Sequence, residues 1–466
     1  MKRETVIMNS NNHIPHFTRG EHGQSLDENK NNNKTDLLVY SLLALGVITA
    51  GIFIGRNSNK TPSQVQTVES YVTKLAKGLG ELTGEKINPE SLSCIMSKED
   101  FLNAISGLKR ENYIASAENI KNGIFRADLH SHSLYSDGKG SVENILTQVC
   151  NYADMLHSKT GEKFLFALTD HDSIEGVKEA LKIISKNPEK FKNVKFVIGS
   201  EVSFLIKSTK TSNPCETSEL LVYGINPFSK EVNSFFSGLN SRRLEMRKNY
   251  IKDLQQRFSE VKFSEEEFLN IFLSGRITHI PMMNSYWQLY HYGQIKTVLS
   301  DTAKAKGLEP EQYFKEIMEK APSKLNLHEF KKAGLIEEWI NENPAIAEIN
   351  NKYRPNIDKD GNIIKNWENL IDDIAVALKN EEECSIGFAH PYYISERSDN
   401  LAGIINEVKL KAGDLFKVTE SYHQAYSQGL VQNHSADIEK INKMCEDANL
   451  LPVGGRDNHK ADWLKM

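Results

Sequence analysis

The chain has 466 residues, a formal net charge of -5 and 26% charged residues, and acidic and basic side chains are mixed along it, which argues against a dedicated nucleic-acid binder. The five cysteines are scattered and odd in number, which argues against a disulfide framework and against a zinc finger. The length fits one or two domains, and a single α/β barrel with insertions accommodates most of it.

The first predicted elements are a polar tail and an apolar run. Residues 1–36 are rich in Asn and lack apolar periodicity, which predicts a disordered tail. Residues 37–55, "LLVYSLLALGVITAGIFIG", carry no charge over about 19 residues and nearly span a hydrocarbon core of about 30 Å. A cleaved signal peptide or a buried core helix are the alternatives. We expect a single-pass membrane anchor.

The orientation of this anchor does not follow from its flanks, because the basic residues on its two sides roughly balance. The lack of a disulfide framework is more typical of a reducing compartment. This favours the cytoplasmic side for the part of the chain that follows the anchor.

The next segment, residues 56–122, is predicted to be a helical stalk or lead-in, because Val72, Leu75, Leu79 and Leu82 recur at three- and four-residue steps. Residues 123–466 form one predicted α/β domain. In it, apolar runs such as "KFLFALTDHD" and "VKFVIGSEVSF" alternate with helical stretches near residues 142–157 and 175–185, a pattern typical of a parallel sheet or barrel. The pattern returns in "CSIGFAHP", "LFKVTESYH" and "LLPVGGRDNH". Residues 229–382, between the two parts, are predicted to be a mostly helical insertion.

Each predicted strand ends in residue types that bind metals. These are His130, His132 and Asp137; Asp170, His171 and Asp172; Glu201; His390; Glu420 and His423; and Asp457 and His459. Any one group has a simpler explanation: an H-x-H pair can be coincidence, "TDHDS" a helix N-cap and "GGRDNH" a Gly-rich turn. Because the carboxyl ends of barrel strands meet at one face, their joint occurrence predicts a metal centre.

Imidazoles and carboxylates without thiolates suit Mn, Fe or Zn, and a cluster this rich implies more than one ion. Adjacent ions of this kind activate water and stabilise the oxygens of an in-line displacement, so hydrolysis of a phosphate ester is the predicted chemistry. Glu420 and His423 are predicted to orient the metal ligands by contacting them without binding the metal themselves.

The motif order "HSHSLYSDG", "LTDHDS", "GSEVSF", "GFAHP", "GGRDNH" resembles the PHP family, the polymerase and histidinol phosphatase superfamily of metal-dependent phosphoesterases. The resemblance implies a distorted seven-stranded (β/α) barrel and two or three divalent ions of Mn, Fe or Zn. The implied ligands of the first ion are His130, His132, Glu201 and Asp457, and those of the second are Asp137, His171 and His459. For the third ion, Glu201 would act as a bridging ligand, and His390 would join it. Glu219 stands where many relatives have a further histidine ligand, which implies a third site that is altered rather than lost.

The stretches "LNSRRLEMRKNYI" and "GRITHIP" resemble the branch that dephosphorylates nucleoside 3',5'-bisphosphates and short oligoribonucleotides, although Thr278 replaces the proline expected there. This resemblance implies that His279 is a ligand or a proton donor to the leaving group, a role that His459 could share. It also implies that Arg242, Arg243 and Arg276 bind phosphate, as a planar guanidinium can. The alternative for the arginines is a solvated helix face.

We therefore predict a membrane-anchored phosphatase that hydrolyses a phosphate monoester, such as a nucleotide or short oligonucleotide, by a metal-activated hydroxide. The alternative is a catalytically retired PHP scaffold that acts as a membrane-anchored binding protein through its helical insertion. No long nucleic acid is expected as a partner, because a basic groove signature is missing from the sequence.

Overall fold

The computed structural model of the chain describes residues 69–113, 124–268, 285–320, 330, 334–335, 343–423 and 435–463. The predicted tail (1–36), the predicted anchor (37–55), Arg276 and His279 lie outside the described residues. Within the described residues, no helix combines the length and the apolar character that a membrane span requires. The anchor therefore stays a prediction.

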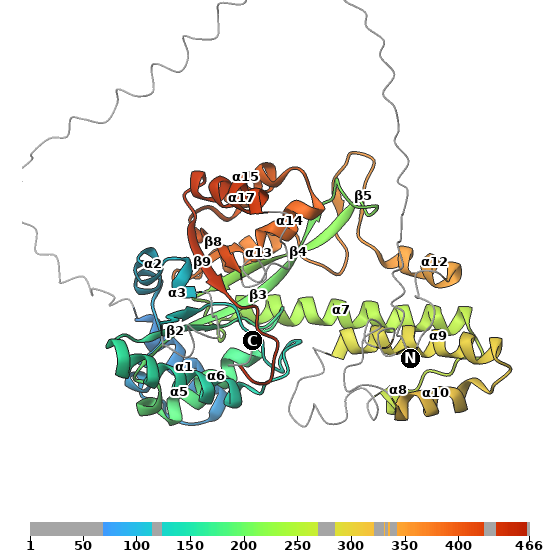
Figure 1. Cartoon of the computed structure of the whole chain (residues 1–466), viewed down its shortest axis with the longest axis horizontal. Helices are drawn as coiled ribbons and strands as arrows, with labels where there is room; N and C mark the ends of the chain where they lie inside the picture. The colour runs from blue at the N-terminus through green and yellow to red at the C-terminus, as the bar shows by residue number, and fades with distance from the viewer. Residues whose placement is uncertain are drawn as a thin grey trace, which may run out of the picture. The chain divides into compact units, whose positions relative to one another are not determined.

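Seven strands form one sheet in the order β1-β2-β3-β4-β7-β8-β9 (Figure 1). Their bounds are Ala127–Asp128 (β1), Phe164–Leu168 (β2), Val194–Lys207 (β3), Cys215–Tyr223 (β4), Ser385–Phe388 (β7), Phe416–His423 (β8) and Leu451–Gly455 (β9). Neighbouring strands are parallel, except that β4 runs antiparallel to both β3 and β7. The predicted α/β class with a seven-stranded, barrel-like sheet is confirmed.

The sheet nearly closes on itself where β9 meets the end of β1. The amide of Leu129 donates to the carbonyl of Gly454 at 3.1 Å, and the amide of His132 donates to the carbonyl of Asn458 at 3.0 Å. A Cβ atom on Gly455 would lie 2.3 Å from the Cβ of His130. The glycine pair that resembled a turn in the sequence therefore belongs to a strand, and its lack of side chains lets the barrel close beside His130.

Helices cover the outside of the barrel as the βα alternation predicts. They are α5 (Val142–Thr160), α6 (Glu175–Lys186), α14 (Pro391–Arg397), α15 (Leu401–Ala412) and α17 (Ser435–Asp447), with short 3-10 turns at Pro89–Leu92, Pro188–Phe191 and Gly413–Leu415. Helix α5 begins at the Ser141 cap, whose hydroxyl accepts from the amide of Asn144, and ends at Gly161 with φ 75°. These are the start and stop signals that a helix of this kind requires.

Alternating residues of the strands face two different cores. Phe164, Phe166 and Leu168 of β2 pack against the outer helices, while Leu165 and Ala167 face the interior of the barrel. The interior layer also contains Val197, Leu221, Val418 and Val453, so every long strand contributes to it. A period of two along each strand thus separates the outer core from the inner one.

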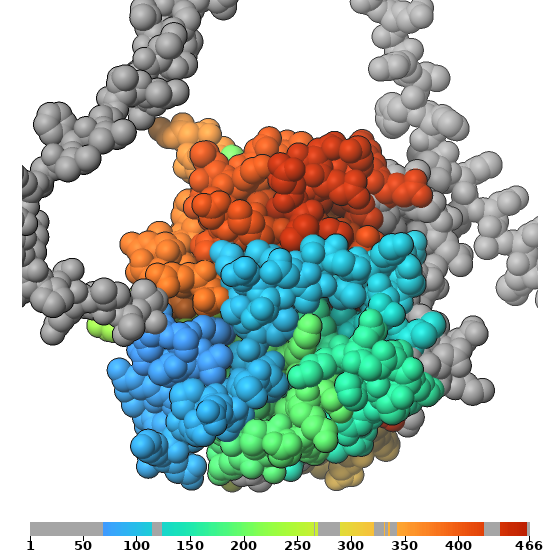
Figure 2. Space-filling view, turned by 90° about the vertical axis from the view of Figure 1, so that its left-hand side faces the viewer, coloured from blue at the N-terminus to red at the C-terminus, as the bar shows by residue number. Residues whose placement is uncertain are grey.

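The helices of the predicted stalk or lead-in lie against the barrel. They are α1 (Tyr71–Thr83), α2 (Lys98–Ser106) and α3 (Arg110–Tyr113). Leu75 and Leu79 belong to the outer core, whereas Phe101 and Tyr113 pack into the inner layer, with the ring of Phe101 5.0 Å from that of Tyr223. Figure 2 shows this light-blue segment seated between the green and the red parts of the barrel. Helices α2 and α3 therefore plug the barrel interior.

Residues between β4 and β7 form a largely helical region with a core of its own. Its elements are α7 (Lys230–Arg257), α8 (Glu265–Phe268), α9 (Ser285–Ala305), α10 (Pro310–Glu319), α12 (Pro344–Tyr353), the hairpin β5 (Asn356–Ile357) and β6 (Ile363–Ile364), and α13 (Ile371–Leu378). Tyr250 and Leu254 of α7 pack with Tyr292 and Ile295 of α9 in this second core. Helix α7 runs continuously from the barrel into that region (Figure 1).

We expect Phe101→Ala to lower the free energy of unfolding by about 3–5 kcal/mol, because it leaves a cavity in the inner layer of the barrel. Urea unfolding followed by circular dichroism measures this change. Asn103→Ala, on the exposed face of the same helix, is the control and should cost less than about 0.5 kcal/mol. Equal effects of the two substitutions would show that α2 is a surface appendage.

Candidate metal centre

The polar strand ends converge into four overlapping groups of histidine and carboxylate side chains. In each group the atoms that could bind a metal lie within 4.8 Å of one another. The groups are His132, Asp137, His171 and His459; His130, His132, Glu201 and Asp457; His130, Glu420 and His423; and Glu201, Glu219 and His390. The nine predicted ligands all occur in these groups, so the fold brings them together from six of the seven strands and their ends.

Glu201 of β3 is the common member of two groups. Its Oε2 atom lies 3.0 Å from His130 Nε2 and 3.1 Å from His171 Nδ1, and its Oε1 atom lies 3.0 Å from His390 Nε2. The side chain is fully buried. A carboxylate in this position can bridge two cations, which is the role that the resemblance implied for it.

Asp457 and Asp137 occupy the other side of the cluster. Asp457 Oδ1 lies 3.0 Å from His132 Nε2 and 3.4 Å from His130 Nε2. Asp137 Oδ2 lies 3.0 Å from His459 Nε2, and its Oδ1 lies 3.8 Å from His171 Nε2. The two carboxylates thus separate a buried group around Glu201 from a more exposed group around His459.

Second contacts fix which ring nitrogen of His130 and of His459 faces the centre. His130 Nδ1 donates to Glu420 Oε1 at 2.9 Å, which leaves Nε2 for a metal. His459 Nδ1 lies 2.9 Å from the carbonyl oxygen of Asp457; since a carbonyl can only accept, this nitrogen carries a proton, and Nε2 is the nitrogen that could bind a metal. Glu420 also accepts from the amide of His390 at 2.9 Å. These contacts orient ligands as carboxylates and carbonyls do beside metal-bound histidines.

The serines of "HSHSLYSDG" support the same loop. Asp170 accepts from the amide and hydroxyl of Ser133, each at 2.7 Å, and from the hydroxyl of Ser136 at 2.7 Å. Ser136 Oγ lies 3.4 Å from His132 Nδ1. These contacts were not predicted from the sequence, because a serine one or four residues from a histidine is common and only the fold shows which carboxylate it reaches.

The pKa values of the histidines depend on the carboxylates around them. Burial would lower the pKa of His171 and of His390, but Glu201 and other carboxylates outweigh it and raise both to about 9. Burial lowers the pKa of His132 to about 4, together with the charges of His459 and His171. Burial opposes the negative charge of Glu201, but the surrounding histidines outweigh it and hold the pKa of Glu201 well below its usual value.

The donor chemistry of these groups fits divalent cations. Imidazole nitrogens and carboxylate oxygens, with no thiolate in any of the four groups, are the donors that Mn, Fe and Zn share. Glu201 and Glu420 are fully buried and Asp457 is partly buried, and the charge of a cation would compensate these three carboxylates. The residues present therefore fit a metal centre.

The predicted phosphate-binding arginines of α7 lie in a different setting. Arg243 is buried and forms ion pairs with Asp172 and Glu368. Arg242 donates to Asn369 Oδ1 at 3.1 Å. Because Arg243 already pairs with two carboxylates of the protein, we assign it a structural role in place of the predicted phosphate contact. Arg276 and His279 lie outside the described residues.

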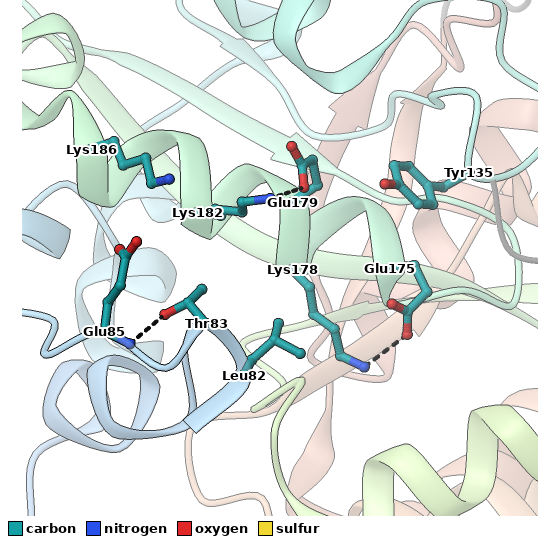
Figure 3. Close-up of a pocket in the computed structure, with 9 residues that line it drawn as sticks. All are labelled: Leu82, Thr83, Glu85, Tyr135, Glu175, Lys178, Glu179, Lys182 and Lys186. Carbon is teal, nitrogen blue, oxygen red and sulfur yellow. Dashed lines mark hydrogen bonds and ion pairs between the residues drawn. The ribbon is translucent and has the colours of Figure 1, made fainter. Parts of the chain in front are cut away.

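A separate hollow of about 400 Å³ lies between the end of α1 and helix α6 (Figure 3). Two of its three lysines pair with neighbouring glutamates: Lys178 Nζ lies 2.8 Å from Glu175, and Lys182 Nζ lies 3.6 Å from Glu179. None of its lining residues belongs to the four metal-binding groups. We assign it no role in the chemistry of the centre.

Comparisons with known proteins add only a general likeness. Neither a family model nor a curated protein matches this chain. The solved structures that are similar to it include a protein from Bifidobacterium adolescentis assigned as a metal-dependent phosphoesterase, and an amidohydrolase from Chromobacterium violaceum with bound sulfate and no metal. Each is 16% identical, covers 72% of this chain and 88% of its own, and has a TM-score of 0.40 or 0.41, respectively. Values this low support no argument about activity.

Arg243→Ala should lower the free energy of unfolding by about 3–5 kcal/mol, because it leaves Asp172 and Glu368 buried without their cation. Urea unfolding measures the loss. Arg257→Ala, at the exposed end of the same helix, is the control and should have little effect. If Arg243→Ala left stability unchanged, the structural role assigned to Arg243 would be wrong.

Metal binding should release protons at pH 7. His171 and His390 are protonated there because their pKa values are about 9, and the carboxylates around His130 also raise its pKa well above the ordinary value. A histidine must lose a proton to bind a metal, so we expect release of at least two protons per chain. Affinity should rise with pH up to about 9. Calorimetric titration of Mn²⁺ in buffers of different ionisation enthalpy measures the release. Heats that do not depend on the buffer would contradict this expectation.

Proposed function

We propose that the chain is a metal-dependent hydrolase that acts on a phosphate monoester. The observation that carries this proposal is the convergence of the nine predicted ligands into groups whose donor atoms lie within 4.8 Å of one another. Overlapping groups that share Glu201 and His132 suit two or three adjacent ions better than a single one. When bound, such ions activate water at neutral pH and neutralise the charge that develops on a phosphoryl group.

The residues of the chain divide the remaining work. Glu420 and the carbonyl of Asp457 hold the proton on Nδ1 of His130 and His459, so that both rings present Nε2 to the centre. The inner apolar layer and helices α2 and α3 exclude water from the barrel below the cluster, which strengthens the electrostatic interactions within it. The partly exposed rings of His171 and His459 mark the side on which a substrate would enter.

The sequence predicts that His279 or His459 donates a proton to the leaving group. If His459 binds a metal through Nε2, it has no proton there to give, since its Nδ1 proton is held by the carbonyl of Asp457. This favours ligation over acid catalysis for His459. His279 stays a prediction, and nucleotide substrates such as 3',5'-bisphosphates stay the first class to test.

We expect Asp457→Ala and His130→Ala to lower the metal content of the full-length chain and to reduce phosphate-monoester hydrolysis by a factor on the order of 100 or more, because each removes a ligand of a shared group. The measurements are metal per chain by plasma mass spectrometry and phosphate release from p-nitrophenyl phosphate and nucleoside 3',5'-bisphosphates. His157→Ala, an exposed histidine near the end of α5, is the control.

Two results would count against the proposal. Full metal content and full activity in both variants would show that the groups are not the centre. A wild-type chain that binds two or more ions but hydrolyses none of these esters would favour the retired scaffold instead.

A further inference from the structure

One face of helix α14 carries a predicted metal ligand and two further polar groups. His390 precedes the helix, and Tyr393 and Arg397 follow it at three and seven residues, a spacing that places all three on the same side. The ring of Tyr393 lies 5.1 Å from that of His390 and 6.4 Å from that of His423. The helix therefore extends outward from the metal centre along this face.

Hydrogen bonds hold both the backbone carbonyl and the guanidinium of Arg397 in place. Its carbonyl accepts from the hydroxyl of Ser208 at 2.9 Å and from the amide of Thr209 at 3.1 Å, in the loop that joins β3 to β4. Its Nη1 atom donates to the carbonyl of Thr217 at 2.5 Å, two residues before Glu219 on β4. A guanidinium anchored in this way loses little conformational freedom when it binds a ligand.

These contacts leave N–H donors of the guanidinium available for a ligand. The nearest carboxylate oxygen, Glu219 Oε2, lies 4.0 Å from Nη1, at the limit for an ion pair. The side chain is 32% exposed, and among the described residues Thr217 is its only hydrogen-bond acceptor. Arg397 thus brings a cation with spare donors to the edge of the group formed by Glu201, Glu219 and His390.

Tyr393 offers a second donor at the same edge. Its side chain is partly buried, and its hydroxyl has no hydrogen-bond partner among the described residues. Burial and the charge of Asp457 raise the pKa of Tyr393, while Arg397 lowers it. The phenol therefore lies beside the metal centre and on the same helix face as Arg397.

We propose that Arg397 and Tyr393 form the phosphate subsite of the metal centre, with the guanidinium binding the phosphate oxygens and the phenol donating a further hydrogen bond. The inference rests on the proposed function and deepens it. A guanidinium matches phosphate in shape and charge, and such charge-assisted hydrogen bonds are among the strong ones. The subsite replaces the contact that the sequence assigned to Arg243, which is paired with Asp172 and Glu368.

The test measures binding of inorganic phosphate to the full-length, Mn²⁺-loaded chain by calorimetry, together with metal per chain and the KM and kcat for a phosphate monoester. Arg397→Gln should weaken phosphate binding and raise KM by about tenfold or more, Arg397→Lys should have a smaller effect, and Tyr393→Phe should weaken binding about threefold. Metal content should not change. Arg257→Gln, an exposed arginine on α7, is the matched control.

Two outcomes would overturn the subsite. In one, Arg397→Gln and Tyr393→Phe bind phosphate like the wild type while the wild type hydrolyses esters, so the proposed function stands without the subsite. In the other, phosphate binding falls only in proportion to lost metal, which would mean that Arg397 serves to balance the charge of Glu219. Phosphate binding that depends on Arg397 in a chain that hydrolyses no ester would keep the subsite and refute the proposed function.

Discussion

The buried carboxylate of Glu201 is the constraint on which the arrangement of the strand ends depends. Removing a carboxylate from water costs several kcal/mol unless cations or hydrogen-bond donors compensate it. Here the compensation comes from His130, His171 and His390, which follow three different strands and lie 3.0–3.1 Å from its two oxygens. The ends of β1, β2 and β7 are thereby tied to β3. The same need for positive charge is why this end of the barrel suits divalent cations.

On the inward face of a single strand, apolar residues of the inner core are followed by side chains of the metal centre. On β3, Val197 faces the inner apolar layer and Glu201, four residues on, faces the cluster. On β4, which runs in the opposite direction, Leu221 belongs to the apolar layer and Glu219 to the cluster. Both strands therefore place a carboxylate above a leucine or valine. Because α2 and α3 fill the interior on the apolar side, the charged groups interact across a region from which water is excluded.

Features that depend on local pattern could be predicted from the sequence, and features that depend on distant pairing could not. The βα alternation and the metal-binding types at strand ends are local, so the barrel and the residues that converge were predictable. The pairing of Arg243 with Glu368 joins residues 125 positions apart, and a run of charges on a helix gives no sign of it. Arg397 was missed for the same reason: only the fold brings the end of α14 beside β4.

The pairing of Arg243 with Asp172 also connects the helical region to the metal centre. Asp172, the residue after His171, adopts a positive φ of 48°, and its carboxylate accepts from the amide of Ser203 at 2.8 Å and from its hydroxyl at 2.6 Å. Arg243 adds a third contact from α7. The strained backbone beside His171 is thus held by β3 on one side and by α7 on the other. Because α7 continues into the second core, Arg243 joins that core to the strand end that carries His171.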